Sequence, residues 1–181
     1  MKLCIVGTGY VGLVSGTCFA DLGNTVYCVD KDVNKINLLN KCEIPIYEPG
    51  LNELVKKNFS QNRLIFTNDI KLAIKNSDII FICVGTPTDK KTNSANLKYV
   101  FNATKEISKY INKYKIIVNK STVPVTTGDK IEKLIKKKYK NIDIISNPEF
   151  LREGEAIRDF RFPDRVIIGV NNKKFLKKMR F

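Results

Sequence analysis

Short apolar runs alternate with amphipathic stretches along the whole chain. The apolar runs are LCIVG, TVYCVD, RLIFT, DIIFICVG, KIIVNKS, IDIISN and RVIIGV, and most are rich in Val and Ile. Continuous β-branched runs of this length are typical of strands that are buried on both faces of a parallel sheet. Between them, apolar residues recur at helical spacing, which predicts helices over 10–22, 32–41, 50–59, 69–76, 97–112, 126–138 and 154–160.

This alternation predicts an α/β fold: a doubly wound, mostly parallel sheet of the Rossmann-like kind with helices on both faces. No repeat or low-complexity linker interrupts residues 1–181, so we expect one such domain. In these folds ligands bind at the carboxyl ends of the strands, so the loops after the strands are where function is expected. The last stretch, 171–181, again has helical spacing.

Composition and charge narrow the class of protein. With 43% hydrophobic and 28% charged residues the chain is expected to fold. It has no apolar run near the roughly 20 residues that span a bilayer, and no cleavage site after its N-terminal apolar stretch. We predict a soluble cytoplasmic protein with no membrane association.

The net charge of +14 is typical of proteins that bind nucleic acid, but lysines in stretches such as KIEKLIKKKYK alternate with apolar residues at helical spacing. We therefore expect a solvated lysine face and no nucleic-acid partner.

Cysteine and histidine content limits the chemistry. The five cysteines form no CxxC pair, so we expect reduced, mostly buried thiols and no metal site; they are Cys4, Cys18, Cys28, Cys42 and Cys83. The sequence contains no His. The usual general base at neutral pH is therefore missing, and proton transfer must use Lys, Glu, Asp, Thr or Cys.

A glycine-rich turn follows the first apolar run. The spacing Gly7-Thr-Gly9-Tyr-Val-Gly12 matches the G-x-G-x-x-G pattern of dinucleotide-binding folds. In that pattern the first glycine permits a tight turn, the second lets a pyrophosphate approach the backbone, and the third lets the helix lie close to the strand. The N-terminus of the following helix attracts phosphate. The pattern favours a phosphate-binding turn, with an ordinary glycine turn as the alternative.

An acidic residue stands where the same pattern needs one. The second apolar run ends in Asp30, 18 residues beyond Gly12. A carboxylate at this position accepts hydrogen bonds from ribose hydroxyls and repels a 2′-phosphate. Lys31 and Lys35 lie nearby in the sequence and would soften this discrimination. We predict NAD as the cofactor.

Three later strand ends carry polar turns. DIIFICV is followed by Gly85-Thr-Pro-Thr-Asp89, and KIIVNK by Ser121-Thr-Val-Pro124. Each alone fits an ordinary turn or helix cap, but together, at one edge of a dinucleotide fold, they favour contacts to a ligand. The third, NPEFLREG at 147–154, fits either a Pro-led helix start or part of a site.

Five segments together resemble the UDP-glucose 6-dehydrogenase family in their residues, order and spacing. They are GTGYVG, PIYEPGL at 45–51, GTPTD at 85–89, KSTVP at 120–124 and NPEFLREGEAIRDFRFPDRVIIG at 147–169. The resemblance covers essentially the whole chain, and NPEFLREG is its most specific part. Other nucleotide-sugar 6-dehydrogenases share some of these segments, so a GDP-mannose 6-dehydrogenase relative stays an alternative.

The resemblance implies an oxidation of UDP-glucose at the sugar C6, from alcohol through aldehyde to carboxylate, with two NAD reduced. It implies cofactor contacts by Gly7, Gly9, Tyr10, Val11, Gly12, Asp30, Lys35, Thr86, Thr122 and Glu153. It implies substrate contacts by Glu149, Phe150, Leu151, Arg152 and Glu153. In the family the aldehyde is captured by a catalytic Cys; Glu149 resembles the acid/base for hydrolysis of the resulting thioester, and Thr122 the residue that helps to place the reacting water.

The rest of the family's architecture does not match this sequence. Family members continue into a helix that forms a homodimer and then a C-terminal UDP-sugar-binding domain, which carries the Cys in a G-G-x-C-x-P-K-D setting. No cysteine here has that setting, so no nucleophile is assigned. Thr126 also stands where many relatives have Gly after STVPV. The resemblance therefore implies the NAD-binding half of the enzyme, inactive alone.

Two other functions remain open from the sequence. One is a non-catalytic dinucleotide-binding module, or a split subunit that works with a complementing C-terminal chain. The other is nucleic-acid binding by the positively charged surface, since the net charge is +14. Such binding should then persist at physiological salt concentration.

Overall fold

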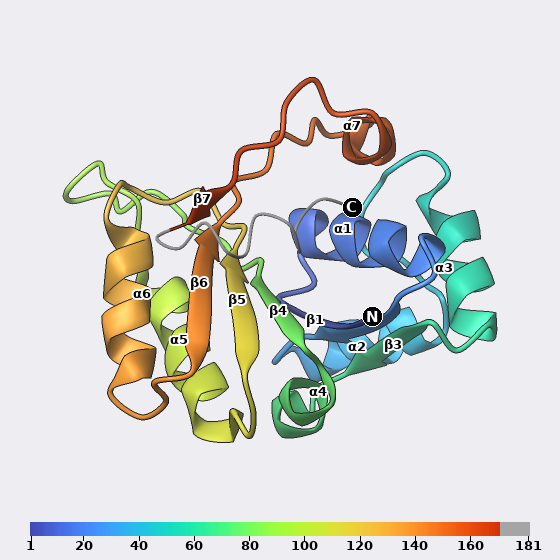
Figure 1. The fold of residues 1–181 in the computed structure, drawn as a ribbon. Coiled ribbons are helices and arrows are strands. Elements are labelled where there is room, and N and C mark those ends of the chain that lie inside the picture. Colours follow the sequence, from blue (N-terminus) through green and yellow to red (C-terminus); the bar gives the residue numbers. More distant parts are fainter. Residues whose placement is uncertain (171–181) are drawn as a thin grey trace.

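The computed structural model describes residues 1–170 and is built around one sheet (Figure 1). The strand order is β3-β2-β1-β4-β5-β6-β7. The first six strands are parallel to their neighbours, and β7 pairs antiparallel with β6. The bounds are β1 Lys2–Val6, β2 Thr25–Val29, β3 Leu64–Thr67, β4 Ile79–Ile82, β5 Lys115–Asn119, β6 Ile142–Ser146 and β7 Gly169–Val170. The predicted doubly wound, mostly parallel sheet is confirmed.

The helices begin and end within two residues of their predicted bounds. They are α1 Tyr10–Asp21, α2 Val33–Asn40, α3 Leu51–Ser60, α4 Ile70–Asn76, α5 Lys98–Tyr110, α6 Thr127–Lys136 and α7 Ala156–Arg161. Asp32 and Asp69 cap α2 and α4 by accepting a backbone N–H two or three residues into the helix. The helix expected over 171–181 lies outside the described residues.

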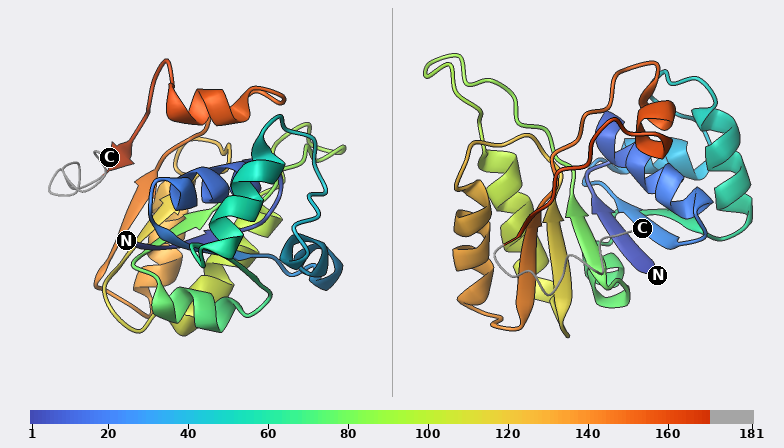
Figure 2. Two further views of the ribbon diagram at one scale, coloured as in Figure 1. Left: turned by 90° about the vertical axis from the view of Figure 1, so that its right-hand side faces the viewer. Right: turned by 45° about the horizontal axis from the view of Figure 1, so that its top comes forward.

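The buried apolar side chains of the strands belong to one of two cores, one on either face of the sheet. Leu3 and Ile5 of β1 pack with α1, α2, α3 and α7, whereas Cys4 and Val6 pack with α4, α5 and α6. Successive side chains of a strand point to opposite faces of the sheet, and here nearly all of them are apolar. The strands therefore need helices on both faces. The further views in Figure 2 show the two helical layers with the sheet between them.

The run RVIIGV departs from the prediction of a buried strand. Only Gly169–Val170 pair with β6, and Val166 and Ile167 are 62% and 47% exposed. This part of the chain connects α7 to β7 over the carboxyl ends of the strands (Figure 1), where no helix within residues 1–170 covers these two side chains. An apolar run does not identify a buried strand when the neighbouring layer is missing.

The order of strands creates the site. β1 lies between β2 and β4, so the chain crosses to opposite sides of β1 after its first and third strands. Such a reversal leaves a crevice at the carboxyl edge of the sheet. The glycine-rich turn, Asp30 and the loop after β4 lie at this edge. No helix within residues 1–170 is long and apolar enough to cross a membrane.

Candidate functional site

Two glycines of the glycine-rich turn are required by the protein itself. Gly7 has a left-handed backbone, with φ of +100°, and a Cβ there would lie 2.6 Å from the Cys83 carbonyl oxygen. A Cβ on Gly12 would lie 1.9 Å from the carbonyl oxygen of Gly7. The first glycine therefore permits the turn, and the third lets α1 pack directly against it.

Gly9 differs from both. Its φ of −72° and ψ of −170° are open to any residue, and a Cβ there would meet no atom within 4 Å. Nothing in the described part of the chain therefore requires a glycine at this exposed position. Gly9 caps α1, and no side-chain hydrogen bond satisfies that helix start. The open space thus borders backbone N–H groups that attract an anion.

Asp30 ties the end of β2 to the glycine-rich turn. Its Oδ2 accepts hydrogen bonds from the Thr8 N–H at 2.9 Å, the Thr8 hydroxyl at 2.8 Å and Lys35 Nζ at 3.0 Å. Its Oδ1 accepts from the Asp32 N–H at 3.1 Å. Burial raises the pKa of Asp30, but these hydrogen bonds outweigh it and hold the pKa below its usual value. Asp30 is a carboxylate, and Oδ1 keeps a lone pair for a ribose hydroxyl.

The loops after β4 and β5 are joined to each other. The Thr86 hydroxyl donates to the Thr122 carbonyl oxygen at 2.9 Å, and the Ser121 hydroxyl donates to the Val84 carbonyl oxygen at 2.7 Å. Val84 is also next to the position of a Cβ on Gly7. The structure therefore brings the predicted Thr86 and Thr122 to one rim beside the glycine-rich turn, and the Thr122 side chain is exposed there.

The charged segment after β6 is held by its own side chains. Glu149 Oε2 accepts from the Leu151 N–H at 2.6 Å. Arg152 binds Asp159 through Nε at 3.0 Å and Nη2 at 2.7 Å, and Nη2 also lies 2.7 Å from Glu155 Oε2. The hydrogen bond from Arg152 is the main reason that the pKa of Asp159 falls to about 2. The Arg152 guanidinium is thus engaged within the segment and fixes its shape.

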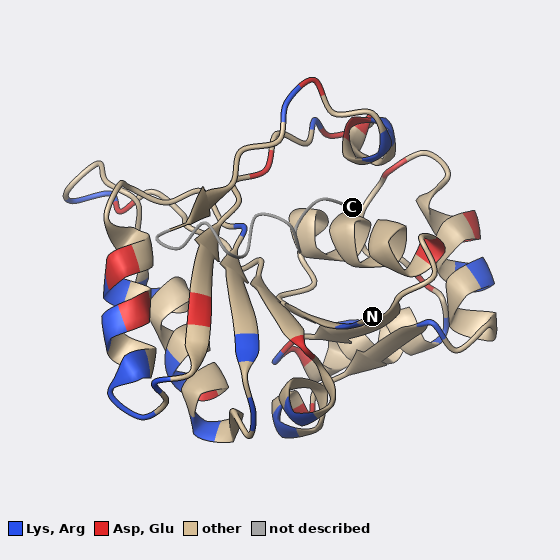
Figure 3. Ribbon diagram, in the orientation of Figure 1, with Lys and Arg blue, Asp and Glu red and all other residues tan. Residues whose placement is uncertain are grey.

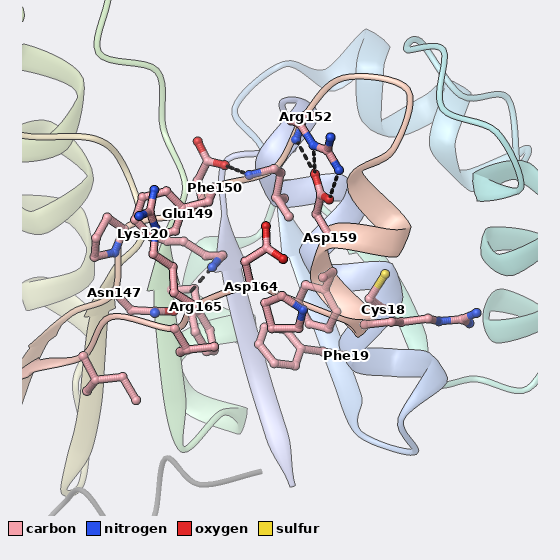
Figure 4. Close-up of a pocket in the computed structure, with 18 of the residues that line it drawn as sticks. Cys18, Phe19, Lys120, Asn147, Glu149, Phe150, Arg152, Asp159, Asp164 and Arg165 are labelled. Carbon is pink, nitrogen blue, oxygen red and sulfur yellow. Dashed lines mark hydrogen bonds and ion pairs between the residues drawn. The ribbon is translucent and has the colours of Figure 1, made fainter.

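A cleft of about 830 Å³ lies between this segment, α1 and the ends of β4 and β5 (Figure 4). Its lining includes four of the residues predicted to contact substrate, which are Glu149, Phe150, Leu151 and Arg152. Glu153, Thr122 and the predicted cofactor contacts are not part of the lining. The cofactor rim and the cleft are therefore distinct surfaces that share the edge of the sheet.

Lys120 is not among the site residues that the sequence predicts. It directly follows β5, it is only 7% exposed, and its Nζ lies 3.3 Å from Asn147 Oδ1 in the cleft wall. Burial lowers the pKa of Lys120, while the nearby Cys83 and Glu149 partly oppose this. A buried ammonium beside a carboxylate in a cleft is a feature of functional sites. Its position at the end of a predicted strand could have indicated a site residue. In a chain this rich in lysine, however, a single lysine does not stand out as functional.

Glu48 is also missing from the sequence-predicted set. It comes from the PIYEPGL segment, is 7% exposed, and accepts hydrogen bonds from the Tyr10 hydroxyl, the Gly154 N–H and the Ile157 N–H. These donors belong to the glycine-rich turn and to the charged segment. Burial and the bond to Glu48 raise the pKa of Tyr10 to about 12, so its hydroxyl stays protonated.

The cysteines do not supply a nucleophile. All five are free, and all but the half-buried Cys42 are buried, as predicted. Burial raises the pKa of the Cys18 and Cys83 thiols to about 12, so neither is a thiolate at neutral pH. Within residues 1–170 no cluster of Cys, Asp or Glu could hold a metal ion.

The residues at the rim fit a dinucleotide. Gly9 has empty space beside it, and the start of α1 has no side-chain hydrogen bond to its N–H groups, so this part of the rim suits a pyrophosphate. The ionised Asp30 follows at the end of β2, where a dinucleotide presents its ribose. Each feature has a partner in the ligand, and Gly9 has no other explanation within the described residues.

Comparison with known families gives a match over nearly the whole chain. Residues 1–180 match the NAD binding domain of the UDP-glucose/GDP-mannose dehydrogenase family. Curated relatives include the UDP-glucose 6-dehydrogenases of Rhizobium meliloti, 52% identical over 94% of this chain, and of Bacillus subtilis, 54% identical over 96%. The matched region is 40% and 38% of those proteins, so this chain spans about two fifths of their length.

Solved structures agree with this match. A GDP-mannose dehydrogenase from Pseudomonas aeruginosa, solved as a ternary complex, superposes with a TM-score of 0.91 at 37% identity. A UDP-glucose dehydrogenase from Pyrobaculum islandicum superposes with a TM-score of 0.90 at 35% identity. They cover 96% and 95% of this chain, which corresponds to 42% and 41% of their own chains.

Proposed function

Because this chain belongs to the UDP-glucose/GDP-mannose dehydrogenase family, we propose that it binds NAD and forms the NAD-binding part of a UDP-glucose 6-dehydrogenase. The observation that carries this proposal is Gly9. The backbone and surroundings of Gly9 would accept a side chain, so its glycine serves a ligand that approaches the start of α1.

The chain's own residues would hold three parts of the cofactor. The backbone of Gly7 to Gly12, with Tyr10 and Val11 in the first turn of α1, would bind the pyrophosphate. Asp30 and Lys35 would contact the ribose, and Thr86, Thr122 and Glu153 would border the nicotinamide. When bound, NAD supplies the hydride acceptor for each oxidation. The Asp30 carboxylate supports NAD over NADP, because a 2′-phosphate beside it would be repelled.

The cleft would receive part of the sugar nucleotide. Phe150, Leu151 and the backbone around Arg152 line it, and Glu149 stands at its rim with one carboxylate oxygen bound to the Leu151 N–H. We assign Glu149 as the acid/base and Thr122 as the residue that places the reacting water. Lys120, buried beside Glu149, would hold negative charge that develops at a substrate oxygen.

UDP-glucose is the favoured substrate. The Rhizobium meliloti and Bacillus subtilis relatives, which share more than half of their matched residues with this chain, are UDP-glucose 6-dehydrogenases. GDP-mannose is the alternative, supported by the superposition on the Pseudomonas aeruginosa enzyme. The free thiols fit a reducing compartment such as the cytoplasm.

The remaining catalytic groups would come from beyond the matched region. Since the relatives are more than twice as long, we propose that dimerisation and the nucleophilic Cys belong to their further length, supplied either by continuing chain or by a complementing chain. The chain itself, mixed with NAD and UDP-glucose, should then form no NADH. Steady turnover by this chain alone would contradict the proposal.

The variant Gly9→Ala tests the cofactor site. NADH titration by fluorescence should show binding to the wild type, and the methyl group should weaken it about tenfold or more, equivalent to about 1.4 kcal/mol. Because no atom lies within 4 Å of the added Cβ, the midpoint of thermal unfolding should stay unchanged. Gly12→Ala is the contrasting variant, since its Cβ would collide with the backbone and should destabilise the fold. Equal NADH affinity in Gly9→Ala would overturn the assignment.

A further inference from the structure

Three segments that are far apart in the sequence meet at Glu48. Its Oε2 accepts from the Tyr10 hydroxyl and, at 2.9 Å, from the Gly154 N–H, and its Oε1 accepts from the Ile157 N–H at 3.1 Å. The Gly154 N–H also donates to the Tyr10 hydroxyl oxygen at 2.9 Å. A carboxylate that is 7% exposed needs such donors, because burying it without partners would be costly.

The local backbone conformation orients the Glu48 carboxylate and its donors toward one another. Pro49 restricts Glu48 to an extended backbone, and Gly50, with φ of +76°, then starts α3. Gly154 has φ of +89°, a left-handed turn that directs its N–H inward. Tyr10 is the first residue of α1, directly after Gly9. The carboxylate therefore spans from the phosphate-binding turn to the segment that carries the predicted substrate contacts.

We propose that Glu48 is a positioning residue, which fastens the 152–157 turn to the start of α1 so that the cofactor turn and the segment 149–153 keep one relative arrangement. This inference rests on the proposed function, because the arrangement matters only if cofactor and substrate meet there. Glu48 has both carboxylate oxygens engaged by protein donors, so it acts through other residues and not on a ligand.

Other contacts hold the far end of the same segment. Phe160 packs edge-on against Phe19 with ring centroids 4.9 Å apart, and Arg161 Nη2 lies 2.7 Å from Asp21 Oδ2. These contacts attach α7 to the C-terminal half of α1. Loss of the Glu48 contacts should therefore loosen the 152–157 turn locally and leave α7 attached. This local effect separates positioning from a general role in stability.

Hydrogen exchange without cofactor tests the fastening directly. In Glu48→Gln, a side-chain NH₂ replaces one acceptor oxygen and faces N–H donors, so the Gly154 and Ile157 amides should exchange about tenfold faster or more. The Val118 amide in β5, an interior strand of the sheet, should exchange at the wild-type rate. Glu43→Gln, an exposed carboxylate in the loop before Glu48, is the matched control and should change neither.

Tyr10→Phe is a second variant, which tests the same proposal if Glu48→Gln fails to fold. It removes the hydroxyl but leaves both N–H bonds to Glu48, so the Gly154 amide should exchange faster than in wild type and the Ile157 amide should change little. If neither variant speeds exchange at Gly154, or if Val118 speeds up equally, the positioning role is wrong.

Adding NADH separates this inference from the proposed function. In the wild type NADH should slow exchange at both the glycine-rich turn and Gly154. In Glu48→Gln it should slow exchange at the turn alone, a difference that a purely structural role would not produce. Slowing at Gly154 in the variant as well would overturn the inference. If NADH does not bind the wild type, the proposed function fails, and the cofactor-free rates still decide whether Glu48 fastens the turn.

Discussion

At the scale of a single residue, Lys115 is buried in the fold, where a charged ammonium group is energetically unfavourable. It begins β5, its side chain is fully buried, and its Nζ donates to the Ser77 carbonyl oxygen at 2.5 Å. Burial lowers its pKa to about 8; Lys113 adds to this effect, and Asp78 and Cys4 oppose it. An unfolded chain holds a lysine proton up to a pKa of about 10.4, so folding favours the neutral amine.

The pH dependence of stability should reveal this lysine. Between pH about 8 and about 10.4 the unfolded chain binds more protons at Lys115, so its contribution to stability rises with pH. Lys115→Met removes that rise. The free energy of unfolding of the variant minus that of the wild type should therefore fall by up to about 3 kcal/mol across this range. Denaturant titrations at several pH values measure it.

Lys130→Met serves as the control for this experiment, because Lys130 is exposed on α6. Its stability should follow that of the wild type at each pH. A constant difference between Lys115→Met and the wild type would show that Lys115 titrates normally in the fold.

At the scale of the element, α6 begins with a strained residue. Thr126 caps this helix with φ of +71° and ψ of −6°, and its side chain makes no capping hydrogen bond. Left-handed backbone is unfavourable for a β-branched residue and free of strain for glycine. A glycine would therefore suit this position better than a threonine.

Thr126→Gly should consequently stabilise the protein. Relief of backbone strain outweighs the greater freedom of glycine in the unfolded chain, and we expect a gain of up to about 1 kcal/mol. The midpoint of thermal unfolding should rise by about 2–4 °C. Thr127→Gly is the matched control, since Thr127 is buried and its hydroxyl donates to the Pro124 carbonyl oxygen at 2.7 Å; it should lower the midpoint. A lower midpoint for Thr126→Gly would contradict the strain argument.

At the scale of the whole molecule, positive charge is in excess. The net charge is +14, and Figure 3 shows basic residues spread over the helices, with several on α6. The lysines of α6 are exposed, as the sequence predicts, and Lys136 pairs with Glu132 at 2.5 Å. Such a solvated face supports the expectation of no nucleic-acid partner, which stays a prediction.

Salt should stabilise a molecule with this charge. Like charges repel within the compact state, and about 0.3 M salt shortens the screening length to well below 10 Å. The midpoint of thermal unfolding should therefore rise by a few degrees between about 0.02 and 0.3 M NaCl and then level off. A steady rise that continues at higher salt would instead indicate general salting-out, and no rise would mean that the ion pairs already balance the repulsion.

Much of the fold and part of the site follow from the sequence alone. The apolar period and the helix ends depend on residues a few positions apart, so they predicted the layers and most element bounds. The roles of Gly7 and Gly12 were predictable for the same reason, because the turn and the close approach of α1 are local. The position of Asp30 at the end of β2 also follows from chain order.

Tertiary structure alone decided how these parts meet. The bond from Thr86 to Thr122, the burial of Lys120 in the cleft wall and the pairing of Arg152 with Asp159 depend on how loops pack, and spacing along the chain does not encode this. Glu48 is the clearest case, since its three donors lie 38 to 109 residues away. The exposed apolar run before β7 also shows that the sequence pattern alone does not determine burial. Local pattern determines which residues are apolar, whereas the neighbouring layer decides whether they are buried.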